Sequence, residues 1–172
     1  DDVIYFSPAD RNHPVGFNLF ENVDPEYKNI VSSGIVGVFK KIFGESWGPR
    51  LEYILRNVVL GLLDYPGATL LQVLKVLNDT KFRRSVVEKI EDPIIKDFFI
   101  NEFERYDQKF RTEAIAPIQN KVGQFLSSTV VRNIVGQSSN SINIRQAMDE
   151  SKILLIDLSI GKVGEDNSQL LG

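Results

Sequence analysis

Residues 152–158 read KILLIDL, and this stretch decides the fold class. It is a continuous apolar run bounded by turn-forming residues, which is typical of a strand buried on both faces of a parallel sheet. Near the other end of the chain, residues 3–6 (VIYF) are β-branched and aromatic and are stopped by Ser7 and Pro8, so they predict a second short buried strand. Between the two runs the chain is mostly helical in pattern. The sequence therefore predicts two strands that flank a helical block.

The helical block is predicted over residues 25–127. Asp24 and Pro25 form an N-cap followed by a proline at the first helical position, and apolar residues then recur every three or four positions until Gly44. A further helix is predicted from residues 46–49 to about residue 63, and shorter ones over residues 69–77 and 81–90. Asp92 and Pro93 repeat the capping signature and open a long helix, which Pro117 kinks or restarts before residues 118–126.

The last part of the chain changes character. Ser128 is predicted to cap a short helix over residues 130–135, and Asn143 another over residues 144–148, before the strand at residues 152–158. We therefore predict a mainly α protein in three parts, namely residues 1–24, 25–127 and 128–172. The chain also stops a few residues into a predicted helix, so we expect it to be a piece of a longer protein.

Charge and composition exclude several classes of protein. The middle part holds 15 Lys and Arg against 13 Asp and Glu, a net charge of +2, whereas the flanks hold 5 against 10, a net of −5. No cysteine is present, which excludes disulfides and thiol nucleophiles, and the single histidine, His13, excludes a multi-histidine metal centre. The longest aliphatic stretch, residues 58–63, is far short of the roughly 20 residues that span a bilayer. These features predict a globular, cytoplasmic protein.

Two short motifs suggest nucleotide chemistry, and neither is complete. Residues 153–157 match the outline of a Walker B strand ending in an acid, but the expected Glu is replaced by Leu158. The interpretation we favour for Asp157 is a turn cap at the end of a core strand. Residues 161–164 (GKVG) do not form a phosphate loop, because Val163 stands where Ser or Thr is required. The chain therefore lacks a Walker A motif and is expected to be inactive as an ATPase alone, with no catalytic, metal or cofactor-binding residue and no cofactor of its own.

Three basic residues in one predicted helix, Lys81, Arg83 and Arg84, are the candidate nucleic-acid contacts. They would lie on a solvent face and approach a phosphate backbone. The alternative is an ordinary solvated helix face, since Glu88 and Glu91 partly neutralise the patch. Any DNA binding is predicted to be weak and non-specific, because the local net charge is small.

Several motifs, taken in order, resemble a known family. They are residues 3–10 (VIYFSPAD), 14–19 (PVGFNL), 47–52 (WGPRLE), 131–137 (VRNIVGQ), 152–159 (KILLIDLS) and 161–166 (GKVGED). The combination resembles the conjugative coupling proteins of the TraG/TraD type, which are DNA-pumping ATPases of the FtsK/HerA superfamily.

The resemblance implies a RecA-like nucleotide-binding core interrupted by an all-α domain. On that reading residues 1–24 and 128–172 belong to the core, and residues 25–127 are the inserted domain. It further implies a hexameric ring that moves DNA with ATP and Mg²⁺. The family's Walker A would precede Asp1 and its Walker B would follow Gly172, so Asp157 would lie on the strand before Walker B.

The sequence therefore leaves two alternative functions for this chain. The first is a piece of an ATP-driven DNA translocase of the conjugation or type IV secretion kind. The parent protein of such a piece is membrane-associated in some cases. Its expected partners are DNA, other copies of itself, and a secretion-system or relaxosome protein. The second is a stand-alone helical module that docks a protein partner and has no motor.

Overall fold

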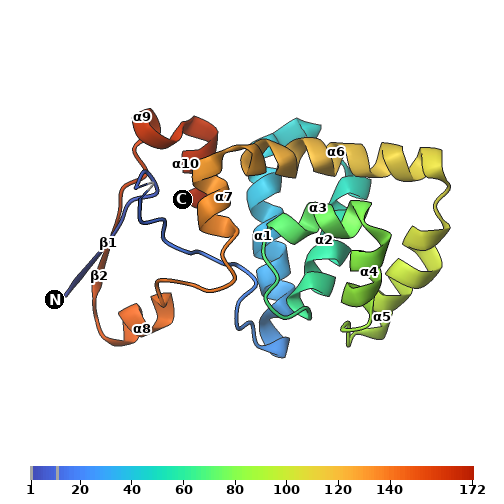
Figure 1. Cartoon of the computed structure of the whole chain (residues 1–172), viewed down its shortest axis with the longest axis horizontal. Coiled ribbons are helices and arrows are strands. Elements are labelled where there is room, and N and C mark those ends of the chain that lie inside the picture. The colour runs from blue at the N-terminus through green and yellow to red at the C-terminus, as the bar shows by residue number, and fades with distance from the viewer. Residues whose placement is uncertain (1, 11) are drawn as a thin grey trace.

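The computed structural model describes residues 2–10 and 12–172, and it is mainly helical (Figure 1). Two strands, β1 (Val3–Phe6) and β2 (Ile153–Ile156), lie at one end of the molecule's long axis, and α4 and α5 lie at the other. The α-helices are α1 (Lys28–Phe43), α2 (Pro49–Leu63), α3 (Leu71–Asn78), α4 (Thr80–Val87), α5 (Pro93–Asp97), α6 (Gln108–Ser127), α7 (Thr129–Val135), α8 (Ile144–Asp149), α9 (Ile160–Val163) and α10 (Glu165–Leu171). Short 3-10 turns cover Pro25–Tyr27, Gly44–Ser46 and Phe103–Arg105, and Phe98–Glu102 forms a π-helical turn.

The two predicted strands are confirmed, and they pair with each other. They run parallel, with Val3 opposite Ile153 and Phe6 opposite Ile156, although nearly the whole chain separates them in sequence. A parallel pair needs a long crossover connection, and here the helical block provides it. Helices α1 to α8 therefore lie, in sequence, between two strands that are neighbours in one sheet.

The prediction that residues 152–158 form a strand buried on both faces is wrong, and the strand at residues 3–6, predicted to be buried, is buried only at Phe6. Val3, Tyr5, Ile153 and Leu155 share one face of the sheet and are 50%, 62%, 55% and 50% exposed. Successive residues of a strand point to opposite faces, so these four form a continuous apolar surface. The apolar run was identified correctly, but in the described ranges the sheet has only two strands and nothing packs over this face.

The helical block is organised around α2. Its side chains at Ile54, Val58, Val59 and Leu62 are completely buried, and α2 packs against α1, α3 and α6. The predicted end of the first helix at Gly44 is confirmed, and Gly44 has a positive φ of 49° that suits glycine. The start of this helix differs from the prediction, because Pro25–Tyr27 form a 3-10 turn, α1 begins at Lys28, and the side chain of Asp24 makes no capping hydrogen bond. None of the helices in the described ranges is both long and apolar enough to cross a bilayer.

Two helical predictions differ from the structure in detail. Pro117 does not restart a helix, since α6 continues through it. Its ring lies on an exposed position, while the flanking Ala114 and Ile118 are held against the core. The helix expected after Asp92 is also irregular: after α5 it changes to the π-helical turn and then a 3-10 turn, where Phe98, Phe99, Phe103 and Tyr106 stack edge to face or tilted.

Parts of both flanks pack onto the helical block. On α7, Val131 and Ile134 are almost fully buried, and the carbonyl of Ile134 accepts a hydrogen bond from the N–H of Phe17 at 3.1 Å. The amide of Asn18, 5% exposed, donates to the carbonyls of Ala68 and Ser138 at 2.9 and 3.0 Å. The hydrophobic core therefore extends beyond residues 25–127 on both sides.

Candidate functional site

The predicted basic helix exists as α4, and its start is well defined. Asp79 is the N-cap, and its carboxylate accepts hydrogen bonds from the N–H groups of Lys81 and Phe82 at 2.9 and 3.0 Å. These bonds hold the pKa of Asp79 below its usual value, so the cap remains ionised near neutral pH. Lys81 and Arg84 follow on the exposed side of the helix, and neither forms a salt bridge within the described ranges.

Arg83 does not lie on this exposed side, which corrects the prediction that all three cations share a solvent face. It is 1% exposed, and its Nε donates to Glu104 at 2.6 Å. Its Nη1 donates to the carbonyls of Val76 and Leu77 at 2.8 and 3.3 Å. Buried in this way, Arg83 anchors α4 to its neighbours and does not lie on the exposed face of α4 with Lys81 and Arg84.

The sequence contained a signal for this burial. Arg83 precedes Val86 by three positions and Ile90 by seven, and both of these are buried. Residues at this spacing lie on one face of a helix, whereas Lys81, Arg84 and Glu88 occupy the other. Because Lys81, Arg83 and Arg84 are close together in sequence, the prediction placed all three on one face. The spacing of three and four residues assigns Arg83 to the buried face instead.

Glu104 joins Arg83 to a second arginine that the sequence analysis did not select. Arg111, in the first turn of α6, places Nη2 3.6 Å from Glu104, and the same nitrogen donates to the carbonyls of Phe103 and Glu104 at 3.0 and 2.9 Å. Both guanidinium groups lie over the ring of Phe103, at 5.1 Å and 5.4 Å from its centroid. Neither spacing nor local pattern connects these residues in the sequence, because Glu104 and Arg111 come close to Arg83 only in the folded chain.

The other carboxylate of this turn, Glu102, has separate partners. Tyr53 and Tyr106 donate to it at 2.7 and 2.5 Å. Burial, and then the Glu102 carboxylate, raise the pKa of Tyr53 to about 12, and the same causes raise the pKa of Tyr106. Glu102 and Glu104 thus contact different clusters of side chains.

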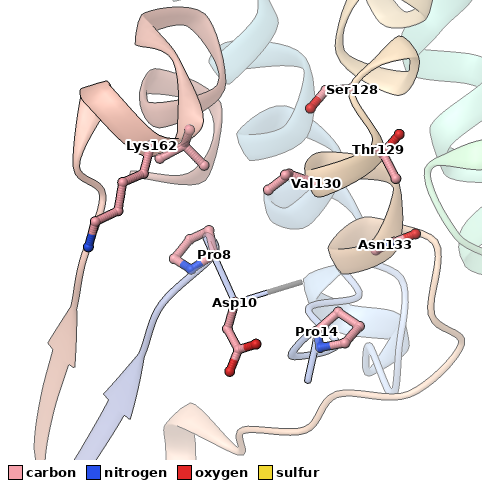
Figure 2. Close-up of a pocket in the computed structure, with 9 residues that line it drawn as sticks. Pro8, Asp10, Pro14, Ser128, Thr129, Val130, Asn133 and Lys162 are labelled. Atoms are coloured by element: carbon pink, nitrogen blue, oxygen red, sulfur yellow. The ribbon is translucent and has the colours of Figure 1, made fainter. Parts of the chain in front are cut away.

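A pocket lies where both strands end, and it was not predicted. It has a volume of about 460 Å³ and is bordered by the segment after β1, the start of α7, and α9. Figure 2 shows Asp10 and Pro8 on one side of the opening and Val130 on the other. In open parallel sheets ligands commonly bind outside the carboxyl ends of the strands, which is the position of this strand-end pocket.

Among the residues that the structure describes, the lining of the strand-end pocket lacks the groups that a nucleotide–Mg²⁺ site requires. Asp157, at the end of β2, accepts bonds from Ser159 and Tyr5 and is paired with Lys162 at 3.2 Å. The Ser159 and Lys162 contacts lower the pKa of Asp157 to about 2, and they confirm its interpretation as a turn cap. The ammonium of Lys162 extends back along β2 and away from the opening (Figure 2). No cluster of three His, Asp or Glu side chains suited to a metal occurs in the residues that the structure describes.

The function must be argued from these placements alone. No family model matches the chain, and no curated protein or solved structure matches it either.

Proposed function

We propose that this chain is part of an ATP-driven DNA translocase of the coupling-protein kind. On this proposal β1 and β2 belong to a RecA-like core, and the helical block is a domain inserted between them that engages DNA. The ATP and Mg²⁺ are bound by parts of the parent protein outside these residues. Further copies in a hexameric ring and a secretion-system or relaxosome protein are its proposed partners.

The observation that carries the proposal is the pairing of Val3–Phe6 with Ile153–Ile156. Strands that are adjacent and parallel in space but separated by a helical block are what an insertion into a parallel sheet produces. The exposed apolar face of the same sheet also favours a larger core. Parallel sheets occur almost only where both faces are covered, so further strands and helices are expected over Tyr5 and Leu155.

The proposed DNA contact is limited to the exposed cations of α4. Helix α4, which carries Lys81 and Arg84, lies toward the opposite end of the molecule from the sheet (Figure 1), and neither residue forms an ion pair within the described residues. Exposed cations neutralise phosphates and release counterions, which gives affinity without sequence preference. With Arg83 buried, only two cations remain, so binding is weak.

Salt dependence of duplex DNA binding tests this contact. If two phosphates are neutralised, a plot of log affinity against log salt concentration has a slope of about −2. Changing Lys81→Glu together with Arg84→Glu is expected to abolish binding. The matched control is Lys41→Glu with Arg145→Glu, which makes the same change in net charge at two exposed positions on α1 and α8. A slope near zero, or equal losses in the two double variants, would contradict the proposed contact.

A second function, a helical module that docks a protein partner, is favoured by one observation. The uncovered face formed by Val3, Tyr5, Ile153 and Leu155 is the kind of contiguous apolar patch that marks an interaction surface. The salt titration separates the two functions, because a module without DNA contact gives no salt-dependent DNA affinity. It would also be insensitive to the Lys81 and Arg84 substitutions.

A further inference from the structure

A polar pocket is lined by residues of the α3–α4 corner and of positions 108–119 in α6. The α3–α4 corner lies away from β1 and β2 (Figure 1). The volume of the pocket is about 170 Å³. The side chains that line it include Thr80, Arg83, Gln108, Arg111 and Gln119, and only Leu77 and Ile115 are apolar. We call it the arginine pocket. A space of this size and polarity suits a small hydrophilic group and excludes a whole nucleotide.

The arginine pocket carries uncompensated positive charge. Arg83 and Arg111 both face Glu104, with the closest N–O distances 2.6 Å and 3.6 Å. Two permanent cations therefore share one carboxylate. Arg83 is 1% exposed, so its charge is poorly screened by water and acts strongly on anything that enters the pocket.

Arg111, which lines the arginine pocket, also has a side-chain donor without a protein partner. The Nε of Arg111 is buried and makes no hydrogen bond, a property shared in the described residues only by Ser32 Oγ. A buried unsatisfied donor on a charged group is costly, and native proteins seldom retain one without a reason. Thr80 adds another donor: its hydroxyl oxygen accepts from Arg83 Nη2 at 3.1 Å, which leaves the hydroxyl hydrogen free to donate.

We propose that the arginine pocket binds a single phosphate group. Guanidinium groups are planar forks that match the oxygens of phosphate, and a phosphate would satisfy the Nε–H of Arg111 while neutralising the excess charge beside Glu104. The phosphate group has two sources, a free phosphorylated small molecule or the backbone of a bound nucleic acid. The site itself follows from the pocket and its arginines and does not depend on the translocase proposal.

Calorimetric titration with inorganic phosphate tests the site. We expect one phosphate per chain and no signal from chloride at the same ionic strength. Arg111→Gln should weaken binding by about tenfold or more, the usual cost of losing a hydrogen bond to a charged group. The matched control, Lys109→Gln, removes the same charge from an exposed position two residues away that does not line the pocket, and it should change affinity by less than about twofold. No phosphate binding, or equal weakening by the two variants, would overturn the proposal.

A measurement on the unaltered chain covers the case in which Arg111→Gln fails to fold. In two-dimensional NMR of the arginine Nε–H groups, phosphate should shift the signal of Arg111, whose Nε has no partner, more than that of Arg83, whose Nε–H is held by Glu104. Thr80→Val, at an exposed helix start, should also weaken phosphate binding. An Arg111 signal that is unmoved at saturating phosphate would overturn the proposal.

Competition separates the two sources of the phosphate group. If excess inorganic phosphate, at constant ionic strength, displaces duplex DNA from the chain and Arg111→Gln weakens DNA binding, the pocket takes a backbone phosphate. If phosphate binds while DNA affinity is unaffected by either change, the pocket takes a small phosphorylated molecule. Both results retain the phosphate site, whereas the absence of any phosphate binding removes it.

Discussion

Arg83 and Glu104 form a nearly buried ion pair that joins α4 to the turn before α6, with 2.6 Å between Nε and the carboxylate. Glu104 is 34% exposed and Arg83 only 1%, so the arginine is the partner that loses its water. Its Nη1 donates to the carbonyls of Val76 and Leu77 near the C-terminal end of α3, and its Nη2 donates to the hydroxyl of Thr80. One side chain thus fixes three neighbouring elements, in a role different from DNA contact.

Removing the carboxylate should therefore destabilise the fold. Glu104→Gln leaves the Arg83 charge buried without its anion, and the free energy of unfolding should fall by about 3 kcal/mol. The matched control is Glu113→Gln on α6, an exposed residue without a salt bridge in the described ranges, which should change stability by less than about 0.5 kcal/mol. Urea unfolding followed by circular dichroism measures both. Equal effects would show that the ion pair contributes nothing beyond surface charge.

The sequence predicted most elements because their signals are local. The caps predicted at Asp92, Ser128 and Asn143 each accept the expected backbone hydrogen bonds. What the sequence did not predict depends on tertiary contacts. Pro117 continues a helix because packing on both sides of it outweighs its poor helix propensity. The arginine pocket and the strand-end pocket each combine segments that no spacing rule connects.

We expect the purified chain to hydrolyse no ATP. A phosphate loop supplies the backbone amides and the lysine that hold a triphosphate, and the sequence has no such loop. Asp157, the nearest match to a magnesium ligand, is already engaged by Ser159 and Lys162. Phosphate release should equal that of a heat-inactivated sample. Turnover clearly above that control would require a nucleotide site of a different kind in these residues.

Stability should decrease in alkali through the tyrosines bound to Glu102. In the folded chain the pKa of Tyr53 is raised to about 12, against an ordinary value of about 10. The folded state therefore keeps this proton more strongly than the unfolded state does. The resulting stabilisation is complete below pH 10 and is lost as the pH rises through 12. Thermal melts across this range should show the loss.

The Glu102→Gln variant identifies the cause of this pH dependence. It removes the negative charge near Tyr53 and Tyr106, although burial of the rings remains. Phenolate absorbance should then develop at lower pH, and the alkaline loss of stability should become smaller. Glu88→Gln, a change at the exposed C-cap of α4, should leave the titration unaltered. An identical phenolate titration in the two variants would exclude Glu102 as a cause.

Finally, residues 25–127 should fold as a helical unit without either flank. The central helix α2 is covered by α1, α3 and α6, which all lie inside this range, whereas β1 and β2 need each other and leave an apolar face exposed.

The fragment of residues 25–127 loses α7, however, and with it the burial of Val131, Ile134 and Val135. At roughly 1.5–3 kcal/mol for each buried side chain, the loss is on the order of 5 kcal/mol. A fragment of residues 25–137, which restores α7, should therefore unfold at higher urea than the shorter one. Circular dichroism and urea unfolding of the two fragments measure this difference, and a random-coil spectrum for residues 25–127 would show that the flanks are required for the helical block to fold.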